Sequence, residues 1–265
     1  MFNLLHRMIQ YLSQFPPIGK LFSSLFGVFE VPILDLFHFI DRYVRSGSYQ
    51  QLMLYFSRFY GSRVVPLDIT LKGIPTLAPT EEILNIIRRV PALSIGWCYC
   101  RKKNQNCDNP IWTCIHIGTA KRLDELGNQI PLKSATIEEV EALLYEAEQL
   151  GLVHQLITAP SPDYVYVICN CCPCCCTMLK NALVYQLHGV VLSSNFIAEH
   201  KNNNCTNCGR CIEKCHFGAR KIEDDNIVFD PHKCVGCGLC VNVCPSDAIQ
   251  LTRRPSMNLK AHLGS

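Results

Sequence analysis

The chain has 265 residues, of which 48% are hydrophobic and 18% charged, and its formal net charge is +3. This length allows one large domain or two to three small ones, and the composition excludes both a disordered chain and a peptide held together by disulfides alone. The charge is too small to argue for nucleic acid as the main partner. Eighteen residues are cysteine, so we expect the function to depend on sulfur.

The beginning of the chain lacks a basic head followed by an apolar run and a small-residue cleavage site. We therefore predict no export signal and expect a cytoplasmic protein, with contact to a membrane surface left open. In a reducing compartment, closely spaced thiols are metal ligands or redox groups more often than structural disulfides. The cysteines therefore favour a metal or redox function.

Aromatic side chains gather in residues 1–75, which contain nine of the twelve phenylalanines. Phe22, Phe26 and Phe29 recur at helical spacing, so we predict aromatic-faced helices with an interruption at Pro32. The longest apolar stretch is broken by charged residues and is not expected to cross a membrane. We expect this region to cap the rest of the protein, with a docking face for a partner protein or a membrane surface as the alternative.

Residues 76–197 form a second region with local signals for secondary structure. A helix is predicted to end near Arg89, before a proline. A capping box of Thr136 and Glu139 begins another helix, which Gly151 ends.

Two strand-like runs follow, at residues 152–158 and 164–168, and the turn-forming sequence AlaProSerProAsp joins them. A helix followed by such a hairpin is the outline of a winged helix. The segment between the strands carries no Lys or Arg, so a DNA-binding redox regulator is only a minor alternative. The dinucleotide and P-loop fingerprints are also missing from the sequence, which argues against direct use of a nucleotide.

Two cysteine motifs near the C-terminus repeat one spacing. The chain reads CTNCGRCIEKC from Cys205 and CVGCGLCVNVCP from Cys234, and the two halves are offset by 29 residues. Three closely spaced thiolates reach three irons of a cubane, and the fourth iron needs a thiolate from farther away. This predicts two [4Fe-4S] clusters, the first held by Cys205, Cys208, Cys211 and Cys244 and the second by Cys215, Cys234, Cys237 and Cys240.

Over residues 198–252 this doubled motif resembles the bacterial-type ferredoxin with two [4Fe-4S] clusters. The resemblance implies a small domain that transfers single electrons. One departure is that His216 follows Cys215, whereas Pro245 follows Cys244 as in the family, and we expect this to change hydrogen bonding near the second cluster. Two zinc sites are the alternative, although zinc needs only paired C-x2-C hooks.

Ten further cysteines lie upstream in two blocks. The first block contains a C-x-C-R motif and the second reads VICNCCPCCC. Together they resemble a recurring central module of ferredoxin-tailed iron–sulfur proteins. The candidate ligands of additional clusters are Cys98, Cys100, Cys107, Cys114, Cys169, Cys171, Cys172, Cys174, Cys175 and Cys176.

We expect at least one further [4Fe-4S] cluster shared between the two blocks. The alternatives are two cubanes, one larger cluster, a zinc site, and thiols that stay unligated or cycle through disulfides. If Pro173 opens a helix, Cys172, Cys175 and Cys176 share one of its sides. Arg101 is expected either to stabilise thiolates or to lie solvated at the surface.

Together these patterns predict an α+β fold with a helical N-terminal region, a central winged-helix-like module, a ferredoxin-like 2[4Fe-4S] domain and a tail at residues 253–265. We expect an iron–sulfur electron-transfer protein that relays low-potential electrons to a redox partner protein. The alternative is a ferredoxin-fed reductase with a substrate-binding cluster or reactive thiols in the central module. His116 and His154 are expected to be structural, hydrogen-bonded residues more often than ligands.

Overall fold

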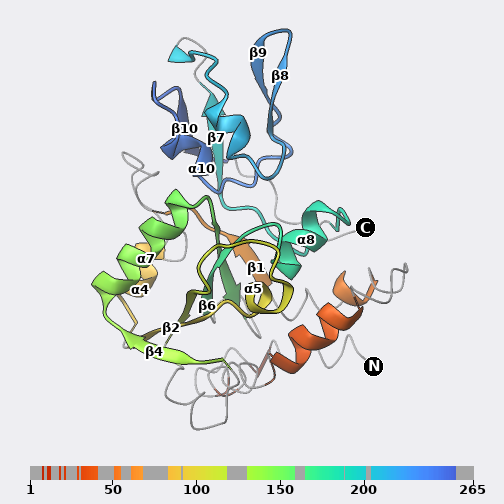
Figure 1. Ribbon diagram of the computed structural model, residues 1–265, viewed down its shortest axis with the longest axis vertical. Helices are drawn as coiled ribbons and strands as arrows, with labels where there is room; N and C mark the ends of the chain where they lie inside the picture. The colour runs from red at the N-terminus through yellow and green to blue at the C-terminus, as the bar shows by residue number, and fades with distance from the viewer. Residues whose placement is uncertain are drawn as a thin grey trace.

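A computed structural model provides the fold (Figure 1). Besides a few isolated helical positions before residue 30, it describes residues 31–40, 51–54, 61–67, 83–90, 92–117, 130–158, 165–187, 189–200 and 204–254.

The central part of the protein is a six-stranded antiparallel sheet with the strand order β1-β5-β6-β3-β2-β4. The predicted hairpin is present as β5 and β6, and it lies inside the sheet, with β1 and β3 as its outer neighbours. The sheet therefore contains more strands than the predicted helix and hairpin would supply. Its edge strand β1 comes from the segment that we assigned to the N-terminal helical region. The strands are β1 Gly61–Val64, β2 Leu93–Trp97, β3 Trp112–Ile117, β4 Leu132–Ala135, β5 Val153–Thr158 and β6 Val165–Cys171.

Helices cover both faces of this sheet. The capping box of Thr136 and Glu139 is confirmed at the start of α7, Ile137–Gln149. Together with α4, Ile83–Ile87, this helix packs Val140 and other apolar side chains against one face. Burying a side chain of this size stabilises the fold by about 1.5–3 kcal/mol.

The opposite face carries the second core and most of the central cysteines. The helix at residues 31–40 and α8, Thr177–Leu183, cover this face, and α5, Tyr99–Asn104, lies beside them. Leu34 and Phe37 of the first helix pack into the core that contains the cysteines. Because strand residues alternate between the two faces of a sheet, Cys169 and Cys171 of β6 both lie on this face.

Part of the predicted aromatic N-terminal region lies within the described residues. Residues 31–40 are helical with Pro32 inside the run, and Phe29, also helical, exposes 57% of its surface. Phe22 and Phe26 lie outside the described residues. Among the described helices, the longest apolar stretches are too short to span a bilayer.

The C-terminal elements form a smaller unit at one end of the molecule, drawn in blue in Figure 1. Its strands pair as β7 with β10 and as β8 with β9, and its apolar core includes Phe196 and Leu251. Its elements are β7 Phe196–His200, α9 Arg210–Glu213, β8 Arg220–Glu223, β9 Asn226–Phe229, α10 Leu239–Asn242 and β10 Ile249–Arg253.

Several hydrogen bonds attach this unit to the central sheet module. His216 Nε2 lies 2.8 Å from the carbonyl oxygen of Gly151, directly after α7. Ser194 Oγ donates to the carbonyl oxygen of Gly236 at 2.8 Å. Gly236 has φ +69°, and a Cβ at this position would overlap the backbone of Phe196. The C-terminal unit thus contacts the sheet module through His216, and Gly236 packs closely against the segment that leads into β7.

Candidate metal centres

The cysteines proposed for the second ferredoxin cluster surround one cavity. Cys215, Cys234, Cys237 and Cys240 line it together with apolar residues such as Phe217. Burial raises the pKa of Cys237, and it raises that of Cys240 to about 11 despite the opposing charge of Arg220. Buried thiols of this kind become thiolates most readily when a metal supplies positive charge.

The cysteines proposed for the first ferredoxin cluster lie closer to solvent. Burial raises the pKa of Cys211, and Cys205 and Cys244 are close enough to raise it further. Cys208 is exposed. The structure thus places Cys244 of the second motif near Cys205 and Cys211 of the first.

Backbone N–H groups point at sulfur in both halves of the repeat. Ala219 donates to Cys215 Sγ at 3.3 Å, and Ala248 donates to Cys244 Sγ at the same distance. Such bonds favour the charged thiolate, and around iron–sulfur clusters they tune the reduction potential.

A buried cation, which the sequence analysis did not single out, lies between the two halves. Arg220 is 3% exposed and donates to the carbonyl oxygen of Ala198 at 3.1 Å. Its positive charge lowers the pKa of Cys211 and of Cys240, one cysteine from each predicted quartet. Arg220 therefore offsets negative charge at both candidate centres.

The ten central cysteines fall into two spatial groups. One group of four has Sγ atoms that all lie within 4.8 Å of one another: Cys107, Cys172, Cys174 and Cys175. The other six line a second cavity: Cys98, Cys100, Cys114, Cys169, Cys171 and Cys176. Each group draws residues from both sequence blocks, as expected for sites shared between them.

The prediction that Cys172, Cys175 and Cys176 share one side of a helix is wrong. Cys176 is the N-cap of α8, which begins at Thr177, so Pro173 does not open that helix. The residues from Cys172 to Cys175 form a turn instead, and this turn sends Cys176 to the six-thiol cavity and Cys172 to the four-thiol group.

The thiols of the six-thiol cavity interact closely enough to shift one another's pKa. Neighbouring thiols, with Cys169 first, lower the pKa of Cys114, and they lower that of Cys171 to about 6. The same interactions, together with burial, raise the pKa of Cys98 and Cys169. Six neighbouring sulfurs around one cavity, four of them buried, can supply the ligands of a polynuclear metal cluster.

Arg101 is buried beside the thiols and does not lie solvated at the surface. Only 2% of its surface is exposed. The guanidinium donates to Thr113 Oγ1 at 3.0 Å, to the carbonyl oxygens of Pro110 and Asn170, and to Cys172 Sγ at 3.7 Å. Burial would lower its pKa, but electrostatic interaction with nearby cysteines, Cys98 first, raises it. Arg101 therefore carries a positive charge between the two central thiol groups.

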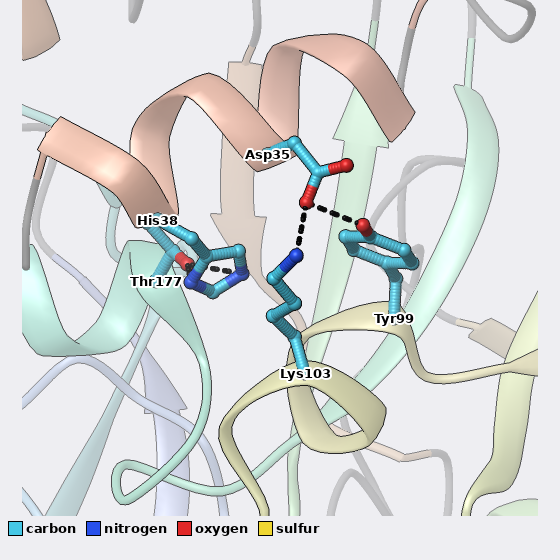
Figure 2. Close-up of polar contacts among 5 residues, drawn as sticks. All are labelled: Asp35, His38, Tyr99, Lys103 and Thr177. Carbon is cyan, nitrogen blue, oxygen red and sulfur yellow. Dashed lines mark hydrogen bonds and ion pairs between the residues drawn. The ribbon is translucent and has the colours of Figure 1, made fainter.

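The helix at residues 31–40 contacts the C-x-C segment through polar side chains (Figure 2). Asp35 accepts hydrogen bonds from Tyr99 Oη at 2.6 Å and from Lys103 Nζ at 2.7 Å. His38 lies 3.3 Å from Thr177 Oγ1, and its imidazole lowers the otherwise raised pKa of Cys100. The sequence analysis missed Asp35 and His38, because nothing local ties a helix at residue 35 to cysteines near residue 100.

The two histidines near the cysteine blocks have different surroundings. His154 Nδ1 is hydrogen bonded to Asn170 Oδ1 at 2.6 Å, as expected for a structural histidine. His116 is 1% exposed and lines the six-thiol cavity, and neither of its ring nitrogens has a hydrogen-bond partner among the described residues. Burial lowers the pKa of His116, and the neighbouring Cys114 partly opposes this shift.

The comparisons with known proteins identify one segment of this arrangement. The family profile of the 4Fe-4S binding domain matches residues 227–250. This segment carries the second cysteine motif, from Cys234 to Cys244. A comparison with curated proteins gave no match. The chain therefore contains a 4Fe-4S binding domain near its C-terminus, next to a cysteine-rich central module.

Proposed function

We propose that the protein is an electron-transfer protein with two [4Fe-4S] clusters in its C-terminal unit and a further cluster in the six-thiol cavity. The observation that carries this proposal is the packing between the two regions. Phe217, Val235 and Cys237 pack against the same apolar core that contains Cys98 and Cys171. The second ferredoxin quartet and the six-thiol cavity are therefore joined by continuous protein contacts.

The exposure of the cysteines suggests an order of transfer. Cys208 of the first quartet is exposed, whereas most cysteines of the central cavity are buried. We infer that a low-potential redox partner exchanges single electrons with the outer quartet. The inner quartet then passes them to the central cluster by outer-sphere transfer.

The residues that line the proposed sites fit iron–sulfur clusters. Buried thiols line both cavities, backbone N–H groups donate to Cys215 and Cys244, and Arg101 and Arg220 supply buried positive charge. Hydrogen bonds and charges of this kind set the potential of an iron–sulfur centre. The protein thus supplies ligands, shielding and electrostatic tuning, and the clusters, when bound, supply the redox chemistry.

A potentiometric titration followed by electron paramagnetic resonance tests this function on anaerobically purified full-length protein. We expect signals from reduced ferredoxin-type clusters and a separate signal that Cys171→Ser removes. The control Cys208→Ser should alter the ferredoxin signals and leave the central signal in place. If Cys171→Ser does not change the spectra, the proposal of a central cluster is wrong. If the protein accepts no electrons, the proposal of an electron-transfer function is wrong.

A ferredoxin-fed reductase is the second candidate, because the cavity holds more thiols than one cubane needs. A [4Fe-4S] cluster takes four thiolates, and the cavity offers six thiols together with His116, which makes no hydrogen bond within the described part of the chain. A substrate such as a disulfide would then react beside the cluster. A central signal that changes when a disulfide is added would favour this candidate over a pure electron carrier.

A further inference from the structure

The four-thiol group has a geometry unlike that of the other thiols. Cys107 Sγ lies 3.6 Å from Cys172 Sγ and 3.7 Å from Cys175 Sγ, and Cys174 completes the set within 4.8 Å. Four thiolates bound tetrahedrally at about 2.3 Å from one zinc ion stand about 3.8 Å apart. The sulfur positions therefore match four ligands around a single ion.

We propose that Cys107, Cys172, Cys174 and Cys175 bind one Zn²⁺ in a closed structural site, separate from every iron–sulfur cluster. In a cubane each thiolate binds a different iron, so its four sulfurs stand farther apart than four ligands of one ion. Within the described part of the chain, the ferredoxin cysteines form no group as compact as this one. A disulfide does not fit either, since bonded sulfurs lie about 2.05 Å apart.

Neighbouring side chains donate hydrogen bonds to two of the four sulfurs. Asn109 Nδ2 donates to Cys107 Sγ at 3.5 Å, and Arg101 donates to Cys172 Sγ. A zinc ion with four thiolates carries a net negative charge, which these donors offset.

Two more asparagines hold the turn that carries three of the ligands. Asn104 Nδ2 donates to the carbonyl oxygen of Cys175, and Asn106 Nδ2 donates to that of Cys174, both at 2.8 Å. The end of α5 and the loop after it are therefore held against the β6–α8 turn by two side-chain to backbone hydrogen bonds. Such prior fixing of the ligands favours a structural site over a mobile redox pair.

The position of the site explains what the ion does. Cys107 follows α5, whereas Cys172 to Cys175 lie between two cysteines of the six-thiol cavity, Cys171 and Cys176. One zinc ion would tie these two segments together at the edge of the cavity. Its binding energy then contributes directly to folding of the central module.

The experiment measures zinc and iron in the anaerobically purified full-length protein and records zinc K-edge X-ray absorption. We expect about one zinc per chain with four sulfur neighbours at about 2.3 Å. Cys107→Ser should remove the zinc while the iron content stays unchanged. The matched control Cys208→Ser should lower the iron content and keep the zinc.

Asn109→Ala keeps the experiment decisive if the cysteine variant does not fold. This variant keeps all four ligands and loses one N–H···S bond, so we expect about tenfold weaker zinc binding in a chelator competition. Wild-type protein without zinc, iron as the ion held by these four sulfurs, or zinc with oxygen or nitrogen neighbours would each overturn the proposal. Loss of iron instead of zinc in Cys107→Ser would overturn it as well.

Discussion

His216 Nε2 donates to the carbonyl oxygen of Gly151 at 2.8 Å, so the residue that follows the last cysteine of the first motif joins the C-terminal unit to the end of α7. Gly151 has φ +79° and ends that helix. Proline, which follows Cys244 at the equivalent place, could not make this bond. The departure at position 216 therefore serves the contact between the two parts of the protein.

His216→Ala should weaken that contact. Loss of one hydrogen bond is expected to lower the free energy of unfolding by about 1 kcal/mol. Anaerobic thermal unfolding monitored by cluster absorbance measures this. His232→Ala, a change at an exposed histidine of the same unit, should leave the melting temperature unchanged; equal effects of both variants would contradict the role of His216.

Gly236→Ala should be more damaging than Gly209→Ala. Both glycines have positive φ, at +69° and +77°, so both variants suffer backbone strain of about 1–2 kcal/mol. A Cβ at position 236 would also overlap Ser194 and Phe196, whereas a Cβ at position 209 meets nothing within 4 Å. We expect Gly236→Ala to lose iron and stability and Gly209→Ala to keep most of both. Iron analysis and thermal unfolding of the two variants compare them, and equal losses would argue against close packing at Gly236.

Arg101→Met should destabilise the central module strongly. The change leaves buried thiolates without their cation and several carbonyl oxygens without a donor, and breaking a buried charge pair costs about 3–5 kcal/mol. Lys102→Met is the matched control, because Lys102 is the exposed neighbour in the same helix. Chemical unfolding under anaerobic conditions measures the difference, and a mild effect of Arg101→Met would show that its charge is not needed.

Glu148→Gln should change how stability depends on pH. Glu148 is 5% exposed near the C-terminal end of α7, and burial raises its pKa to about 7 despite a hydrogen bond with Asn242. Between its ordinary pKa and about 7, the folded protein holds a proton that the unfolded chain has released. Stability therefore falls as pH rises through this window and stays lower above it.

The amide variant has no proton to lose, so it should be more stable than the wild type at pH 8 by about 1–3 kcal/mol and similar to it near pH 4.5. Unfolding curves at both pH values test this. A constant difference between the two proteins, independent of pH, would contradict the assignment of the titration to Glu148.

Local patterns predicted the parts of the structure that depend on local sequence. The capping box of Thr136 and Glu139 and the hairpin of β5 and β6 are visible in short windows of sequence, because caps and turns use specific residue types. The spacing of the C-terminal cysteine motifs also predicts two sets of cluster ligands, and this assignment stays a prediction.

The division of the ten central cysteines could not be predicted in this way. It depends on β6 ending at Cys171, on a turn in place of a helix at Pro173, and on α5 lying beside that turn. These are relationships between segments about seventy residues apart, which spacing does not encode. The burial of Arg101 has the same origin, because its partners come from two other segments, Thr113 in β3 and Asn170 and Cys172 at the end of β6.

The most direct test of the whole account is the amount of iron, acid-labile sulfide and zinc per chain in anaerobically purified protein. Two ferredoxin-type clusters, one central [4Fe-4S] cluster and one zinc site predict about twelve iron, twelve sulfide and one zinc. About eight iron and eight sulfide would contradict the central cluster. About sixteen of each without zinc would contradict the division into six and four thiols.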